Sequence, residues 1–153
     1  MNNQTAVEST ATSSPEQVIR NVLEGRINGQ ISDATADFAG EFRFKDNGIG
    51  LEFHDKKGLA EFFGKTREFY PDSSIHIDGI FVSEDHVIAE WTFQTTLAEP
   101  FFGGQTWKVP VSLQGASIAR MENGKITAWA DYYDGLTSRR SALAAHFTEW
   151  TEL

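Results

Sequence analysis

Four long runs of strand-like sequence in the second half of the chain constrain its fold more than any other feature. They cover residues 74–82, 86–97, 105–120 and 124–134, and the short turn-forming segments SED and ENG connect the first pair and the last pair. Strands joined by such short connections lie next to each other and run in opposite directions. The sequence therefore predicts a long antiparallel meander.

Helical patterns precede this meander. The segment SSPEQVIRNVLEGRING begins with Ser14 as a capping residue and Pro15 at the first helical position, and Gly29 follows its end. ISDATADFAG predicts a second short helix capped by Ser32 or Asp33, and DKKGLAEFFGKTREFY predicts a third. LTSRRSALAAHFTEW predicts a helix that closes the chain.

Helices gathered against a curved antiparallel sheet give an α+β fold, and the helices can close one face of such a sheet into an apolar pocket. Residues 1–14 are rich in Ser, Thr, Asn and Gln, which predicts a flexible tail. Residues 15–153 have a length that suits a single domain.

Composition excludes several classes of function. The net charge is -9, from 13 basic and 22 acidic residues, so nucleic acid and anionic membranes are poor partners. The chain has no cysteine, which excludes disulfides and thiolate chemistry and fits a cytoplasmic protein. The four histidines lack metal-ligand spacing, and no apolar run approaches the roughly 20 residues of a membrane span.

Two strand-like segments place carboxylates among aromatic side chains. In ITAWADYYDG, alternation puts Trp129, Asp131 and Tyr133 on one face. In EFRFKD, the charged residues alternate with an inward set that includes Phe44 and Asp46. A buried, unpaired carboxylate is costly, so these acids require an explanation.

Acid–base catalysis is one explanation. An apolar wall raises the pKa of a carboxyl group, and two neighbouring carboxyl groups push their titrations apart, which provides one acid and one base. The structural alternatives are that Asp131 caps a turn or pairs with an arginine, and that Asp46 only begins the DNGIG turn. Asp134 fits a turn residue better than a catalytic one.

The order of elements, with FAGEFRFKDNGIG, DKKGLAEFF and MENGKITAWADYYD, resembles the nuclear transport factor 2-like, or SnoaL-like, superfamily over about residues 15 to 140. The resemblance implies a cone-shaped fold, with a bent sheet wrapped by three helices around a pocket. Three groups of enzymes in this superfamily share short motifs with the chain.

The segment GKITAWADYYD is similar to limonene-1,2-epoxide hydrolase, in which the first Asp of the motif belongs to an Asp–Arg–Asp relay. Asp131 matches that Asp. The relay's Arg and second Asp correspond to Trp91 and Phe93, and the Tyr and Asn that hold the water correspond to Phe44 and Asp46. The full relay is therefore absent at these positions.

FAGEFRFKD is similar to the lead-in to the catalytic base of ketosteroid isomerase, and that base falls on Asp46. That enzyme's two oxyanion donors fall near Asn21 and Ala116, of which Asn21 can still donate a hydrogen bond. SnoaL-type polyketide cyclases use an Asp at the position of Asp131 as general acid/base for ring closure, without metal or cofactor.

We therefore expect a cofactor-free, metal-free acid/base enzyme that cyclises, isomerises or opens an epoxide of a small hydrophobic polyketide- or terpenoid-like substrate. The alternatives are a hydrolase of the limonene-epoxide type and a non-catalytic binder of an apolar ligand. We also expect a homodimer. The expected catalytic residues are Asp131 and Asp46, and the expected substrate-binding residues are Trp91, Phe93, Phe44, Trp129, Tyr133, Asn21 and Leu113.

Overall fold

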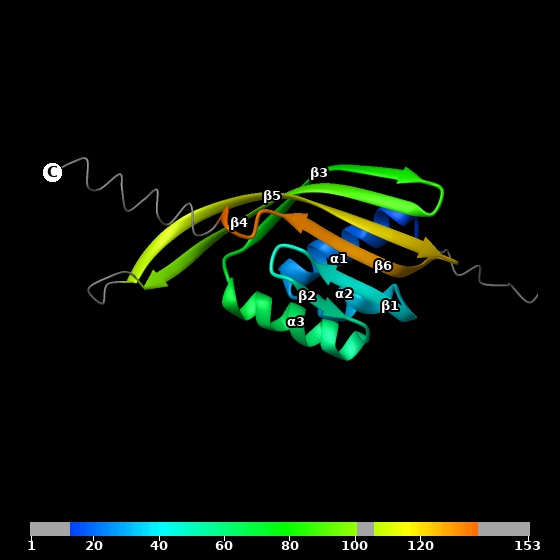
Figure 1. The fold of residues 1–153 in the computed structure, drawn as a ribbon, viewed down its shortest axis with the longest axis horizontal. Helices are drawn as coiled ribbons and strands as arrows, with labels where there is room; N and C mark the ends of the chain where they lie inside the picture. Colours follow the sequence, from blue (N-terminus) through cyan, green and yellow to red (C-terminus); the bar gives the residue numbers. More distant parts are fainter. Residues whose placement is uncertain (1–12, 101–105, 138–153) are drawn as a thin grey trace, which may run out of the picture.

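The computed structural model describes residues 13–100 and 106–137, which form three helices and six strands (Figure 1). In chain order the elements are α1 (Pro15–Asn28), α2 (Ile31–Ala36), β1 (Phe38–Asp46), β2 (Leu51–Phe53), α3 (Lys56–Phe69), β3 (Ser74–Ser83), β4 (His86–Pro100), β5 (Thr106–Glu122) and β6 (Lys125–Tyr133). The expected closing helix and most of the expected flexible tail lie outside the described residues.

The first long helix begins and ends where its capping residues predict, and the other, α3, also begins at a side-chain cap. The Ser14 side chain accepts a hydrogen bond from the backbone N–H of Gln17 at 3.2 Å, and Asp55 accepts one from Gly58 at 2.8 Å. Gly29 ends α1 in the left-handed conformation, with φ of 82°, which glycine adopts without steric penalty. No helix in the described part of the chain is long and apolar enough to cross a membrane.

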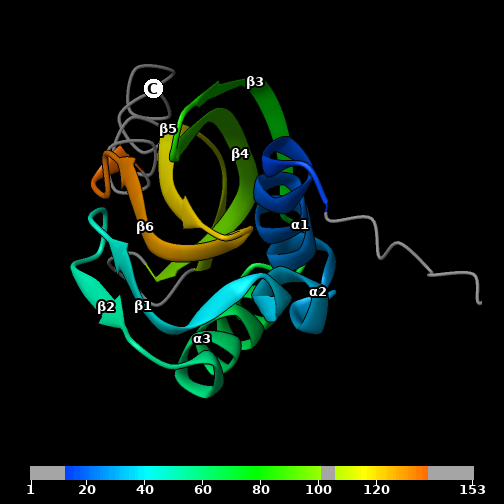
Figure 2. The ribbon, with the colours of Figure 1, turned by 90° about the vertical axis from the view of Figure 1, so that its right-hand side faces the viewer.

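The six strands form one curved sheet in the order β2-β1-β6-β5-β4-β3, with the three helices gathered on one side of the curve (Figure 2). β3 to β6 form the expected antiparallel meander. The sheet is not wholly antiparallel, however, because β1 pairs with β6 in parallel. A parallel pair requires a long connection, and here the chain passes through β2, α3 and three strands of the meander before it returns.

The second helix is shorter than the sequence predicts. α2 ends at Ala36 and begins after Gln30, not after Ser32 or Asp33, and the FAG segment belongs to β1. Burial explains the difference, because Phe38 is only 1% exposed and its ring packs 4.8 Å from that of Phe42, between ring centroids. Tertiary packing here overrides the local helical pattern.

The core lies between the helices and the inner face of β1, β4, β5 and β6. Val18, Ile19, Val22 and Leu23 form the buried face of α1. The rings of Phe44 and Trp129 stack in this core with centroids 6.3 Å apart and an angle of 9° between their planes.

Candidate active site

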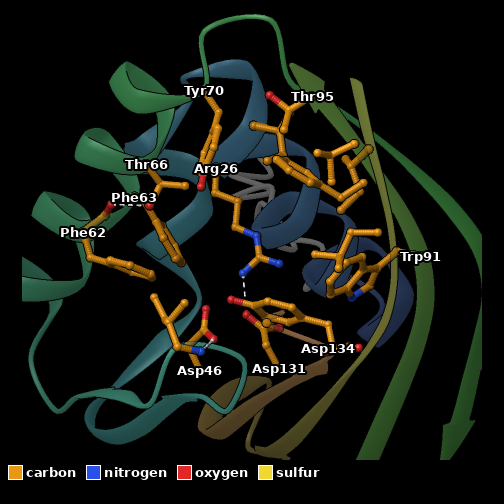
Figure 3. A pocket seen from close by; sticks show the side chains of 18 of the residues that line it. Arg26, Asp46, Phe62, Phe63, Thr66, Tyr70, Trp91, Thr95, Asp131 and Asp134 are labelled. Carbon is orange, nitrogen blue, oxygen red and sulfur yellow. Dashed lines mark hydrogen bonds and ion pairs between the residues drawn. The ribbon is translucent and has the colours of Figure 1, made fainter. Parts of the chain in front are cut away.

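A cavity of about 190 Å³ opens between the curved sheet, α1 and α3 (Figure 3). Arg26 on α1, Asp46 on β1 and Asp131 on β6 are among its polar groups, Thr66, Tyr70, Thr95 and Asp134 add further ones, and aromatic and aliphatic side chains form most of the remaining wall. The lining includes Arg26, Asp46, Asp131, Tyr133, Phe62, Phe63, Ile75, Trp91, Phe93, Leu97, Val111 and Leu113. An apolar cavity with a few convergent polar groups is the usual form of a small-molecule site.

Asp131 is 1% exposed and receives three hydrogen bonds. Its Oδ1 accepts one from the Ser117 hydroxyl at 2.5 Å and one from the Trp129 indole N–H at 2.7 Å. Its Oδ2 accepts a charge-assisted hydrogen bond from Arg26 at 2.7 Å. The buried carboxylate is thus paired, which is one of the two structural roles that the sequence left open.

The direction of the hydrogen bonds around Asp131 follows from their chemistry. The indole N–H of Trp91 donates to the Ser117 hydroxyl oxygen at 2.9 Å, and an indole can only donate. The hydroxyl proton of Ser117 is therefore the one that points at Asp131. With two donors on Oδ1 and a guanidinium on Oδ2, Asp131 is arranged to accept hydrogen bonds from fixed groups.

Arg26 reaches the site from the apolar face of α1, where the neighbouring Val22, Leu23 and Ile27 are buried. Its side chain is 14% exposed, and its guanidinium carbon lies 5.8 Å from the centroid of the Phe63 ring. Figure 3 shows the side chain extending into the cavity toward Asp131, with Asp46 beside them. The sequence patterns did not identify Arg26 as a site residue. The available signal was its position four residues after Val22, which places a charge on an apolar helical stripe.

Asp46 is held in a different way. It is 6% exposed, and its Oδ1 accepts backbone N–H groups from Gly48 at 3.0 Å and from Ile49 at 3.1 Å. Burial raises the pKa of Asp46, and the negative charge of Asp131 raises it further. Hydrogen bonds from the Tyr133 hydroxyl and the Ile49 N–H, together with the charge of Arg26, lower this pKa but only in part offset burial.

The parallel pairing of β1 with β6 brings the two acids together. Asp46 and Asp131 are register partners, and both line the cavity. The expectation that two carboxylates from separate segments meet in one apolar pocket therefore agrees with the geometry.

Four of the seven expected substrate-binding residues line the cavity, and they are Trp91, Phe93, Leu113 and Tyr133. Phe44 and Trp129 lie in the core instead, 0% and 1% exposed. They share a strand face with the acids, but the rings of Phe62 and Phe63 from α3 pack against Phe44.

Asn21 also lies away from the cavity lining. It accepts a hydrogen bond from the Gln17 side chain at 2.9 Å, and it is more than a third of a turn around α1 from Arg26. The sequence also gave no indication of Ser117, because a single serine in an alternating strand carries no recognisable signal. Within residues 13–100 and 106–137, no group of three or more His, Cys, Asp or Glu side chains is placed to bind a metal ion.

Comparison with known proteins identifies the family. The model of the SnoaL-like polyketide cyclase family matches residues 16–142, which is most of the chain. The chain belongs to the SnoaL-like polyketide cyclase family. A comparison with curated protein sequences gives no significant match.

Solved structures share the SnoaL-like fold at low sequence identity. IdmH from Streptomyces antibioticus, described as a candidate polyketide cyclase, is 18% identical with a TM-score of 0.72, over 85% of this chain and 99% of that one. A candidate SnoaL-like polyketide cyclase from Shewanella putrefaciens CN-32 is 11% identical with a TM-score of 0.69, over 84% and 85%.

A third structure, a hypothetical protein from Catenulispora acidiphila DSM 44928 with a ketosteroid isomerase-like fold in complex with trimethylamine, is 18% identical with a TM-score of 0.70, over 84% of this chain and 93% of that one. These likenesses confirm the expected fold. The more specific resemblance to limonene-1,2-epoxide hydrolase stays a prediction.

Proposed function

We propose that this member of the SnoaL-like polyketide cyclase family is a cofactor-free acid/base enzyme that cyclises or isomerises a small hydrophobic carbonyl compound. The observation that carries the proposal is the contrast between the two carboxylates in one cavity. Asp131 is surrounded by fixed donors, whereas Asp46 is buried with a raised pKa and belongs to the same cavity. We assign proton transfer to Asp46 and a supporting role to Asp131.

The proposed reaction begins when the Asp46 carboxylate removes a proton from a carbon next to a carbonyl group. The electron pair of the broken C–H bond moves toward the carbonyl oxygen and forms an enolate. The enolate carbon then attacks a second carbonyl of the same substrate, which closes a ring, and Asp46 returns the proton to the new alkoxide. In an isomerisation, Asp46 returns the proton to a different carbon. Proton transfer of this kind contributes about 10²- to 10⁴-fold to rate.

Arg26 is the group that would stabilise the enolate oxygen. A guanidinium has five N–H donors, and within the described part of the chain Arg26 donates one hydrogen bond, to Asp131. Donors that are already oriented toward the position of a developing negative charge stabilise the transition state. Asp131 holds Arg26 in this orientation, and the aromatic wall limits access of water.

The cavity favours a neutral, ring-sized substrate group. Its volume of about 190 Å³ exceeds the roughly 150 Å³ of an engineered cavity that binds benzene. The positive charge of Arg26 is already matched by Asp131, and Asp46 is a second acid, so an anionic group would meet no net positive charge. A polyketide- or terpenoid-like ketone fits these requirements.

Hydrogen–deuterium exchange at carbon tests the proposal without knowledge of the natural substrate. Cyclohexanone and 2-cyclohexenone serve as neutral probes in D₂O, with exchange measured by NMR. We expect Asp46→Asn to lose about 10²- to 10⁴-fold in the enzyme-dependent rate. Asp78→Asn is the control, because Asp78 lies on β3 away from the cavity lining and bonds to Thr92. Equal exchange by Asp46→Asn and the unsubstituted protein would contradict the assignment.

One observation favours epoxide opening as a second candidate. Arg26 bonds to Asp131, and its charge also acts on Asp46, so two acids and an arginine come together although the arginine is on α1 and not at position 91. Against hydrolysis, Phe44 occupies the position of the water-holding Tyr and is buried in the core. We therefore expect little diol from limonene oxide. Efficient incorporation of ¹⁸O from water into a diol, lost in Asp46→Asn, would instead support hydrolysis.

A further inference from the structure

The two adjacent tyrosines of β6 lie in different environments. Tyr132 is 50% exposed, whereas Tyr133 lines the cavity. Across the sheet, Tyr133 pairs with Gly115, and a Cβ on Gly115 would lie 2.4 Å from the indole of Trp91. That indole packs against the Tyr133 ring with 6.0 Å between centroids. The absence of a side chain at Gly115 thus lets Trp91 support Tyr133 from one side.

A second glycine contacts Tyr133 at its hydroxyl end. A Cβ on Gly48 would lie 2.1 Å from the ring carbon of Tyr133 that carries the hydroxyl, so only glycine fits there without a shift of the ring. Gly48 belongs to the turn whose N–H groups bond to Oδ1 of Asp46. The same turn therefore positions the acid and receives the end of the tyrosine, and the Tyr133 hydroxyl hydrogen-bonds to the Asp46 carboxyl.

While Asp46 is ionised, Tyr133 can only be the donor and Asp46 the acceptor in this contact. Burial, followed by the nearby charge of Asp46, raises the pKa of Tyr133 far above its usual range, so the phenol keeps its proton and donates it in a hydrogen bond. A donor to a carboxylate stabilises the ionised form. That form is the one that the proposed reaction needs at its first step.

We propose that Tyr133 is a positioning residue that holds the Asp46 carboxyl toward the substrate and sets the pH range in which Asp46 accepts a proton. The inference rests on the proposed function, because it assigns a second residue to the same proton transfer. The other charged or titratable groups that face Asp46 are Asp131 on β6 and Arg26 on α1, and Asp134 and Tyr70 line the same cavity.

The direct test is the titration of Asp46, followed by ¹³C NMR of labelled carboxyl groups and assigned by comparison with Asp46→Asn. Tyr133→Phe removes only the hydroxyl, so we expect the midpoint of Asp46 to move to higher pH. Tyr132→Phe is the matched control, with an unchanged midpoint. An unmoved midpoint in Tyr133→Phe, or an equal shift in Tyr132→Phe, would overturn the inference.

A second variant keeps the hydroxyl but displaces it. Gly48→Ala forces the ring of Tyr133 away, and we expect an upward shift of the Asp46 midpoint as in Tyr133→Phe. Gly40→Ala is its control, because a Cβ on Gly40 meets no atom within 4 Å. An unmoved midpoint in Gly48→Ala, with the ring shown to be displaced, would also contradict the inference.

The pH dependence of the exchange rate distinguishes failure of this inference from failure of the proposed function. If both hold, the acidic limb of the pH profile for ketone exchange moves to higher pH in Tyr133→Phe, and the rate at high pH falls less than the rate at neutral pH. A uniform loss at all pH values would show a merely structural role for Tyr133. If the unsubstituted protein exchanges none of the probes while the NMR midpoint still moves, the proposed function fails and the contact between Tyr133 and Asp46 stands.

Discussion

Asp131 and Asp46 are register partners on neighbouring strands, yet the protein holds them in opposite ways. Asp131 is surrounded by side chains from α1, β5 and β6, and a cation balances its charge. Asp46 is bonded to backbone N–H groups of its own turn, and burial raises its pKa. Two buried acids at paired positions of one sheet are thus held by different groups, and this difference is the basis of our proposal that Asp46 transfers the proton while Asp131 supports the site.

The largest expected effect comes from removing the cation of Asp131. Arg26→Met leaves a buried charge without compensation, and such losses typically amount to about 3–5 kcal/mol. Urea unfolding at neutral pH measures the change. Arg20→Met on the same helix is the control, because the Arg20–Glu24 pair is exposed and such pairs contribute about 0–1 kcal/mol. Similar losses in both variants would show that the Arg26–Asp131 pair is no more important for stability than a surface pair.

Removing the hydroxyl that links Trp91 to Asp131 should have an intermediate effect. Ser117→Ala leaves the Trp91 N–H without its acceptor and takes one donor from Asp131, so we expect a loss of about 1–3 kcal/mol in unfolding free energy. Ser112→Ala, at an exposed position of the same strand, should stay within about 0.5 kcal/mol. A neutral Ser117→Ala would mean that the buried chain of hydrogen bonds adds little to stability.

The smallest effect concerns Asp46 and depends on pH. Because folding raises the pKa of Asp46, its contribution to stability is fully present below the unfolded pKa and is lost as pH rises through the folded pKa. Asp46→Asn removes this dependence, so its stability relative to the unsubstituted protein should increase from about pH 4 upward. Melting temperatures measured across this range test the expectation.

For Asp72 the pKa is shifted in the opposite direction to that of Asp46, so the expected change of stability with pH is also opposite. Hydrogen bonds from Thr96 and Thr95 lower the pKa of Asp72, so its contribution is present above the unfolded pKa and is lost as pH falls through the folded pKa. Asp72→Asn should therefore become less stable, relative to the unsubstituted protein, as pH rises. If both Asn variants followed the same trend, the difference in environment between the two acids would be refuted.

The sequence was informative wherever a local period decided the outcome. Alternation in EFRFKD and in ITAWADYYDG placed Asp46 and Asp131 on inward faces, and the cap of α1 followed from Ser14. Those features depend on residues a few positions apart, so one sequence is sufficient to recognise them.

The features that the sequence did not reveal depend on distant contacts. Arg26 and Asp131 are 105 positions apart, and neither segment has a sequence pattern that predicts its pairing with the other. Which inward residues line the cavity and which lie in the core also depends on tertiary packing. On β1, α3 covers Phe44, whereas Asp46 lines the cavity. The parallel pairing of β1 with β6 could not be recognised either, since alternation is the same in parallel and antiparallel strands.

That parallel pair has a consequence for how the chain folds. β1 is an early element and β6 a late one, and contacts between distant segments form slowly because a long loop must close before they can. The meander of β3, β4, β5 and β6 can form from neighbouring segments, but β6 reaches β1 only when the whole intervening chain has been arranged. During refolding, a molecule with a complete meander would still have Asp131 and Asp46 far apart, and both would come together in the step that joins β1 to β6.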